Sequence, residues 1–186
     1  MPRLEHDAYM TPPHYVSALL NEVNIHGHVF EPCVGDGAIA DELRKMASVR
    51  RVYTNDIDKK RKADTHYDAR HTMPVPKFDW AVTNPPFSDM FDIVVHMLDT
   101  VPNVAVLARL SFLEPTEERA DLLENNPPTQ IIVLPRYSFR VNDAGKKQTD
   151  NVTCAWLVWE AHGAPRRTSF YGRGKAQHVA LIRSLT

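Results

Sequence analysis

The amino-acid sequence predicts an α/β fold in which a mostly parallel sheet carries an antiparallel edge hairpin. Three observations support this class. Short apolar runs typical of buried strands alternate with segments of helical spacing. A glycine turn follows the first of these runs and precedes a helical segment. A polar stretch late in the chain separates two further apolar runs. With 186 residues and no internal repeat, the chain is expected to form a single domain over residues 1–186.

The first half of the chain begins with a predicted helix over residues 11–25, where apolar side chains recur at helical spacing after two prolines. Gly27 is its expected end. Residues 28–31 form a short strand that leads into the glycine turn. A helix over 38–46 follows the turn, and residues 51–55 form the next strand.

The second half is predicted to contain four strands, at residues 80–83, 104–110, 131–134 and 152–160. A helix over 88–98 separates the first two, which makes them buried parallel strands of a βαβ unit. The polar residues 142–147 join the last two strands as a hairpin-like loop at the sheet edge. Trp156 and Trp159 lie in the last apolar run and are expected to be core residues rather than an aromatic substrate cage.

Composition limits the classes of protein and of site. No run approaches the roughly 18 apolar residues that span a bilayer, and no signal pattern opens the chain, so a cytoplasmic protein is expected. The two cysteines, Cys33 and Cys154, belong to no metal-ligand pattern, and the nine histidines lack metal-ligand spacing. We therefore expect free thiols, with Cys33 as a packing residue, and no metal site.

The glycine turn reads Glu31-Pro32-Cys33-Val34-Gly35-Asp36-Gly37, between a strand and a helix. Gly35 and Gly37 allow the backbone to approach a ligand closely. A dinucleotide-binding turn would instead read G-x-G-x-x-G and would hold a pyrophosphate. Because the anionic Glu31 would repel a diphosphate, a cationic ligand is expected. S-adenosylmethionine, which has an ammonium and a sulfonium group, fits this requirement.

Two further acids are candidates for ligand contacts. Asp56 follows the next strand and lies 21 residues after Gly35, close to the spacing at which an acid meets ribose hydroxyls. The alternative is that Asp56 caps the following helix. Asp68 precedes the third strand and is placed to accept a hydrogen bond from an adenine amino group, with a plain loop aspartate as the alternative.

The tetrapeptide Asn84-Pro85-Pro86-Phe87 directly follows the third strand and indicates methylation of an amino nitrogen. The amine of adenine is a poor nucleophile, because its lone pair is delocalised into the ring. Two acceptors facing its two N–H bonds would draw the nitrogen toward a tetrahedral geometry. The Asn84 side-chain oxygen and the Pro85 carbonyl supply such a pair, and each proline fixes φ near about −65°. Phe87 offers a flat apolar face for stacking.

These segments resemble the S-adenosylmethionine-dependent amino methyltransferases of DNA, and more specifically the N6-adenine group, whose hallmark is the Asn-Pro-Pro-Phe box. The resemblance covers roughly residues 7–160, and includes Tyr9-Met10-Thr11-Pro12-Pro13, which looks like the family segment that closes over the methionine carboxylate. It implies a Rossmann-like class I methyltransferase fold and the catalytic residues Asn84, Pro85, Pro86 and Phe87. The cofactor-binding residues that it implies are Tyr9, Thr11, Pro12, Glu31, Gly35, Gly37, Asp56, Ile57, Asp68 and Asn84.

Typical sequence-specific members of the family that this chain resembles carry an extra target-recognition region. A chain of 186 residues has little room for such a region. Specificity is therefore expected to be low or borrowed from a partner, as would suit a phage or mobile element. Residues 136–186 hold nine Lys and Arg against three Asp and Glu, a net charge of +6 in a chain whose total is −1. The predicted contacts to nucleic acid are Arg140, Lys146, Lys147, Arg166, Arg167 and Arg173. The alternative is a solvated C-terminal strand and turn.

Other substrates remain open. The Asn-Pro-Pro-aromatic box also fits an amino methyltransferase that acts on RNA or on a protein glutamine. Phe87 in place of a tyrosine, together with Thr11-Pro12-Pro13, favours adenine in DNA. A third alternative is a catalytically silent module that binds nucleic acid or a partner, which the intact box argues against.

Overall fold

The computed structural model describes residues 11–72, 77–135, 140–141, 147–148, 153–161, 167–172 and 175–177. The strands are β1 (Gly27–Glu31), β2 (Val49–Thr54), β3 (Trp80–Thr83), β4 (Val104–Arg109), β5 (Gln130–Val133), β6 (Arg140–Val141), β7 (Lys147–Gln148), β8 (Cys154–Trp159), β9 (Arg167–Gly172) and β10 (Lys175–Gln177). The helices are α1 (Pro13–Glu22), α2 (Ala38–Leu43), α3 (Met90–Thr100) and α4 (Glu117–Asn125), with a 3-10 turn η2 (Leu110–Leu113). No helix within these ranges is long and apolar enough to cross a membrane.

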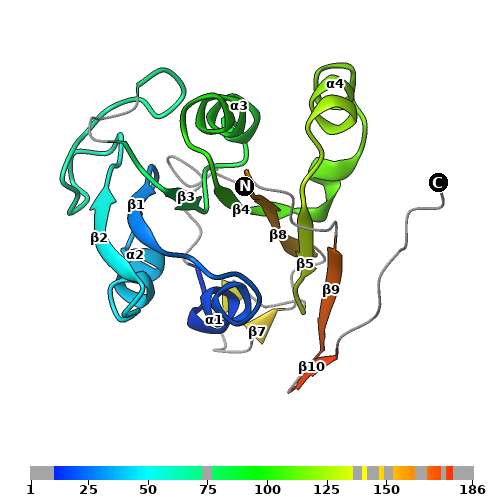
Figure 1. The fold of residues 1–186 in the computed structure, drawn as a ribbon, viewed down its shortest axis with the longest axis horizontal. Helices are drawn as coiled ribbons and strands as arrows, with labels where there is room; N and C mark the ends of the chain where they lie inside the picture. The colour runs from blue at the N-terminus through cyan, green and yellow to red at the C-terminus, as the bar shows by residue number, and fades with distance from the viewer. Residues whose placement is uncertain are drawn as a thin grey trace.

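Eight of the described strands form one sheet in the order β10-β9-β5-β8-β4-β3-β1-β2 (Figure 1). The predicted α/β class is confirmed. β2, β1, β3 and β4 are parallel neighbours, so their carboxyl ends meet at one edge of the sheet. The chain passes from β1 outward to β2 and then returns to β3 on the other side of β1. Ligands in open α/β sheets bind at such a reversal of strand order.

The antiparallel strand β8 lies inside the sheet, between β4 and β5, rather than at its edge. All six of its residues are buried, because it has a neighbour on each side and packed side chains on each face. β6 and β7 lie on either side of the polar stretch that was predicted as a hairpin-like loop, and they pair antiparallel as a separate two-stranded sheet. The antiparallel pair at the edge is instead β9 with β10.

Side chains alternate between the two faces of the sheet and form two apolar clusters. On one face, α1 and α2 pack around Trp156 and Val82. On the other face, α3 packs around Leu157 and Ala81. Figure 1 shows α1 and α2 on one side of the sheet with α3 and α4 on the other. The core assignment of Trp156 is confirmed: its indole N–H donates to the Tyr15 carbonyl at 2.8 Å.

The helices differ from the prediction in their bounds, and one helix was not predicted. α2 ends at Leu43 rather than at residue 46, and α3 lies two residues later than predicted. α1 is shorter at both ends, because Pro12 and Val23 have extended backbone angles. Gly27 does not end this helix; it is the first residue of β1 and has φ 73°. α4 was not predicted, since none of its residues is buried and the apolar spacing that reveals a helix is therefore missing.

Candidate active site

Four polar side chains, which are candidates for function, lie at or just beyond the carboxyl ends of the four parallel strands. Glu31 ends β1, Asp56 follows β2, Asn84 follows β3 and Arg109 ends β4. Because Phe30 is opposite Ala81 in the β1–β3 pair, Glu31 and Asn84 flank the point where the strand order reverses. The fold thus gathers at one edge residues that are far apart in the sequence.

Glu31 is 1% exposed, and its carboxyl group receives a hydrogen bond from the backbone N–H of Ala40 in the first turn of α2. Within the described part of the chain, its Oε2 atom is buried without a hydrogen-bond partner. Burial raises the pKa of this carboxyl well above its ordinary value. A buried carboxyl group with an unpaired oxygen fits a cationic ligand, because an ammonium would supply both the missing donor and the compensating charge.

The glycine turn is fixed to the end of β2. The N–H of Val34 donates to the Asn55 carbonyl at 2.9 Å, and the N–H of Gly35 donates to Asp56 Oδ2 at 2.9 Å. Gly35 has φ 55°, and a Cβ placed on it would meet nothing within 4 Å. Among the described residues, none fills the space next to Gly35, which leaves room for a ligand beside the turn.

Asp56 organises the backbone on both sides of itself. Besides the bond from Gly35, its Oδ1 accepts the N–H of Asp58 at 2.9 Å. This is an Asx turn rather than the helix cap considered as the alternative, because the described residues 55–72, which follow β2, contain no helix. Its carboxylate is partly exposed, so the expected contact with ribose hydroxyls stays a prediction.

Asn55 is a positioning residue that sequence reasoning missed. It is 1% exposed, and its Nδ2 donates to the carbonyls of Pro32 and Tyr67, each at 3.0 Å. Its Oδ1 accepts the Thr65 hydroxyl at 2.9 Å and the Tyr67 N–H at 2.8 Å. One amide thereby holds the start of the glycine turn against the loop that carries Asp68. The sequence feature that could have indicated Asn55 is its position next to Asp56 at the end of a strand.

Asn55→Ala is expected to destabilise the protein by about 2–4 kcal/mol, because it leaves several buried backbone groups without partners. Urea unfolding followed by tryptophan fluorescence measures this change. Asn125→Ala, which removes an exposed amide from α4, is the matched control and should change stability by less than about 0.5 kcal/mol. A loss of similar size in both variants would contradict the proposed role of Asn55.

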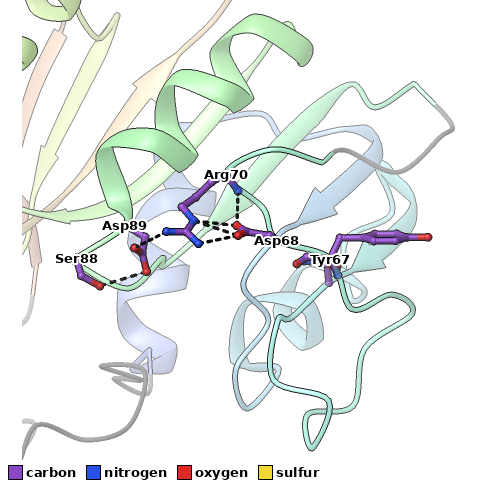
Figure 2. A network of polar contacts seen from close by, with 6 residues as sticks. Tyr67, Asp68, Arg70, Ser88 and Asp89 are labelled. Atoms are coloured by element: carbon purple, nitrogen blue, oxygen red, sulfur yellow. Dashed lines mark hydrogen bonds and ion pairs between the residues drawn. The ribbon is translucent and has the colours of Figure 1, made fainter.

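Asp68 and Arg70 form an ion pair that reaches the start of α3 (Figure 2). The Arg70 guanidinium donates to Asp68 Oδ2 at 2.7 Å through Nη2 and to Asp68 Oδ1 at 2.9 Å through Nε. Its Nη1 donates to Asp89 Oδ1 at 3.3 Å, two residues beyond the Asn-Pro-Pro-Phe box. Arg70 thus connects the loop after β2 to the loop after β3. Asp68 faces Arg70 here, so a bond to an adenine amino group would share oxygens that Arg70 already uses.

Arg70→Gln is expected to raise the pKa of Asp68 from about 2 toward its ordinary value of 3.8, because the Arg70 hydrogen bonds are the largest cause of the depression. A depressed folded-state pKa stabilises the protein above the ordinary pKa, and this stabilisation is lost as the pH falls toward 2. NMR titration of the Asp68 carboxyl carbon in both proteins measures the shift. An unchanged titration midpoint would show that another group holds the Asp68 pKa down.

The Asn-Pro-Pro-Phe box leaves the sheet directly after β3. Asn84 Nδ2 donates to the Thr11 hydroxyl at 3.0 Å, which connects the N-terminal segment to the box. Thr11 is 6% exposed, and Pro85 is buried. In this orientation Asn84 turns its oxygen away from Thr11. Phe87 is partly buried against the core beneath α3, and the Arg109 guanidinium carbon lies 3.9 Å from its ring centre.

Two large apolar side chains are exposed near the acids of the β2 edge. Ile57, a predicted cofactor contact, is 54% exposed, and Tyr67 is 47% exposed. Figure 2 shows the Tyr67 ring pointing away from the ion pair of Asp68 and Arg70. Tyr67 was not predicted as a site residue. The sequence feature that could have indicated it is its position next to Asp68. Exposed apolar groups next to a candidate ribose-binding acid suit the flat ring of a nucleoside.

The predicted residues outside the described ranges are Tyr9, Lys146, Arg166 and Arg173. The backbone of Arg140 lies in β6, that of Lys147 in β7 and that of Arg167 in β9, and their side chains lie outside the description. Cys33 and Cys154 are free thiols, and burial raises the pKa of Cys33, as suits a packing residue. Among the residues whose positions are described, no group of three or more His, Cys, Asp or Glu side chains is placed to hold a metal ion.

Several solved structures with a similar fold are described as methyltransferases. A protein of Pyrococcus horikoshii, provisionally assigned as an RNA methyltransferase, is 15% identical with a TM-score of 0.56, over 81% of this chain and 85% of its own. A SAM-dependent O-methyltransferase of Thermotoga maritima is 14% identical with a TM-score of 0.55, over 84% and 68%. The 23S rRNA methyltransferase ErmE is 15% identical with a TM-score of 0.53, over 84% and 70%.

The chain has the Rossmann-like fold of these methyltransferases. No protein-family model and no curated protein sequence matches it. At this level of identity the likeness concerns the fold, and the site must carry the argument about activity.

Proposed function

We propose that this protein is an S-adenosylmethionine-dependent methyltransferase that methylates the exocyclic N6 amine of adenine in DNA, with low or borrowed sequence specificity. The observation that carries the proposal is the position of Asn84-Pro85-Pro86-Phe87 at the end of β3, across the reversal of strand order from the buried Glu31 at the end of β1. A methyl donor and an amine acceptor would meet across this reversal.

The residues that would hold the cofactor are those with an unpaired polar atom, open space or exposed apolar surface at the site. Glu31 would accept the ammonium group, and the open side of Gly35 leaves room for the chain that carries it. Asp56 would contact the ribose, while Ile57 and Tyr67 would flank the adenine. When bound, S-adenosylmethionine supplies a methyl group already activated by its sulfonium charge.

The chain's own residues position the amine. Asn84 Oδ1 and the Pro85 carbonyl would each accept one N–H of the target nitrogen, and Thr11 holds the Asn84 amide in the required orientation. Positioning at near-attack distance contributes about 7–11 kcal/mol to lowering the barrier. Extraction of a base from a stack costs only a few kcal/mol. Loss of the extra proton after attack requires no strong base.

The proposal is tested by incubating the protein with S-adenosylmethionine and separate pools of duplex DNA, single-stranded DNA and RNA, followed by mass spectrometry of the nucleosides. N6-methyladenine in a DNA pool supports the proposal. Methylated adenine only in RNA would reassign the substrate, since adenine in RNA presents the same amine. Methylated cytosine would reassign the base. Absence of product with measurable cofactor binding would move the assignment to a protein glutamine or a silent binding module.

A further inference from the structure

Arg109 ends β4 at the same sheet edge as the Asn-Pro-Pro-Phe box. β4 pairs with β3 in parallel, with Val106 opposite Thr83, so Arg109 extends beside the residues that follow β3. Its guanidinium carbon lies 3.9 Å from the centre of the Phe87 ring. Arg109 was not among the site residues predicted from the sequence. Its position beside the box depends on the pairing of β4 with β3, which the sequence does not reveal.

The Arg109 guanidinium has no anionic partner within the described part of the chain. Among the side chains that the structure describes, no carboxylate pairs with it, and its buried Nε has no hydrogen-bond partner. Two other arginines have hydrogen-bond acceptors for their guanidinium groups. Arg70 is held by two carboxylates, and Arg119 donates to the Thr116 hydroxyl and the Ser111 carbonyl.

Stacking and hydrogen bonding use different parts of a guanidinium. The contact places the Arg109 guanidinium carbon over the Phe87 ring, and the ring offers no oxygen or nitrogen acceptor to the five N–H donors of the group. The contact with Phe87 therefore positions the Arg109 guanidinium and leaves its N–H groups able to donate hydrogen bonds to a ligand. A planar fork of this kind matches two oxygens of a phosphate.

We propose that Arg109 binds the backbone phosphate next to the target base and so identifies the substrate as a nucleic acid. The proposal rests on the proposed function, because it takes the base to be held at Asn84 and Phe87. A phosphodiester is the anion that lies closest to a base in every strand. Phe87 would then contact both the target base and Arg109, and Arg109 would hold the phosphate of the strand next to that base.

The test uses the full chain loaded with S-adenosylhomocysteine and a short labelled single-stranded oligonucleotide with one adenine. Fluorescence anisotropy over a series of salt concentrations gives the affinity and its salt dependence. Arg109→Gln is expected to weaken binding about 10- to 100-fold. It should also reduce the slope of log K against log salt concentration by about 0.7, the value for one single-strand phosphate contact. Arg109→Lys should keep the slope and recover part of the affinity, since it retains the charge but not the fork.

Arg51→Gln is the matched control. Arg51 also stacks on an aromatic ring, 4.3 Å from the centre of Tyr53, but it is exposed on the edge strand β2. This variant should bind the oligonucleotide as the wild type does. Unchanged affinity for S-adenosylhomocysteine in Arg109→Gln would show that the site is intact.

A neutral methylphosphonate placed in turn on either side of the adenine locates the contact. At one of the two positions it should weaken wild-type binding and have little effect on Arg109→Gln. Equal losses in both proteins at both positions, an unchanged salt slope, or a wild type that binds no oligonucleotide would overturn the proposal. If wild-type binding depends on Arg109 but no base is methylated, the proposed function fails alone. If adenine is methylated with an unchanged slope in Arg109→Gln, the phosphate contact fails alone.

Discussion

Asn84→Ala is expected to lower kcat for methyl transfer by about 100- to 1,000-fold, the range typical of removing one group that acts on the transition state. Without the Asn84 oxygen, only the Pro85 carbonyl would face the amine, and the nitrogen would keep its delocalised lone pair. The Kd for S-adenosylmethionine should change much less than kcat, because the main role proposed for Asn84 is in the transition state, although the resemblance also implies that it contacts the cofactor. Single-turnover rates and calorimetric titration of the cofactor measure the two quantities.

Two further variants separate the chemistry of Asn84 from its packing. Thr11→Val removes the hydroxyl that receives the Asn84 N–H, and should cause a smaller loss of rate because the amide is present but less well oriented. Asn125→Ala removes an exposed amide from α4 and should leave the rate unchanged. A near-normal rate in Asn84→Ala would remove this residue from the mechanism.

Glu31→Gln is expected to weaken S-adenosylmethionine binding about 10- to 100-fold, because it removes a charge-assisted hydrogen bond to the cofactor ammonium. The same change should make the free protein more stable at neutral pH. The raised pKa of Glu31 means that the folded state retains a proton that the unfolded state releases. Wild-type stability therefore falls as the pH rises from the ordinary pKa toward the raised one, and the glutamine variant lacks this dependence.

Thermal unfolding across pH and calorimetry in buffers of different ionisation enthalpy test both parts. Cofactor binding should release a proton in the wild type and not in Glu31→Gln, since the ammonium favours the ionised carboxylate. Glu42→Gln, which replaces the partner of Lys45 on α2, is the matched control and should change neither property. Wild-type affinity in Glu31→Gln would exclude this carboxyl as the cofactor contact.

The sequence predicted the parallel half of the fold because its strands are short apolar runs, and because helical segments separate β1 from β2 and β3 from β4. β3 was located at its observed bounds, since the buried run Trp80–Thr83 ends abruptly at Asn84-Pro85. The position of β8 between β4 and β5 was not predicted. Apolar runs indicate that a strand is buried, but not which neighbours bury it.

The parts of the site that could be predicted are those formed by residues next to one another in the sequence. The box at Asn84 and the turn at Gly35 are contiguous patterns, and the fold places both at one edge of the sheet. Asn55 and Arg109 have no such pattern. Asn55 matters because its amide connects segments 23 and 12 residues away, and Arg109 because β4 lies against β3.

The internal position of β8 also bears on how the chain folds during synthesis. β4 leaves the ribosome about 50 residues before β8, and until then it has an unpaired edge on the side away from β3. β5 likewise lacks the strand that separates it from β4. The elements that carry Glu31, Asp56 and Asn84 can therefore pair early, but the sheet closes only when residues 154–159 insert between strands made before them. Such late, non-local pairing slows folding and exposes strand edges to aggregation while it is pending.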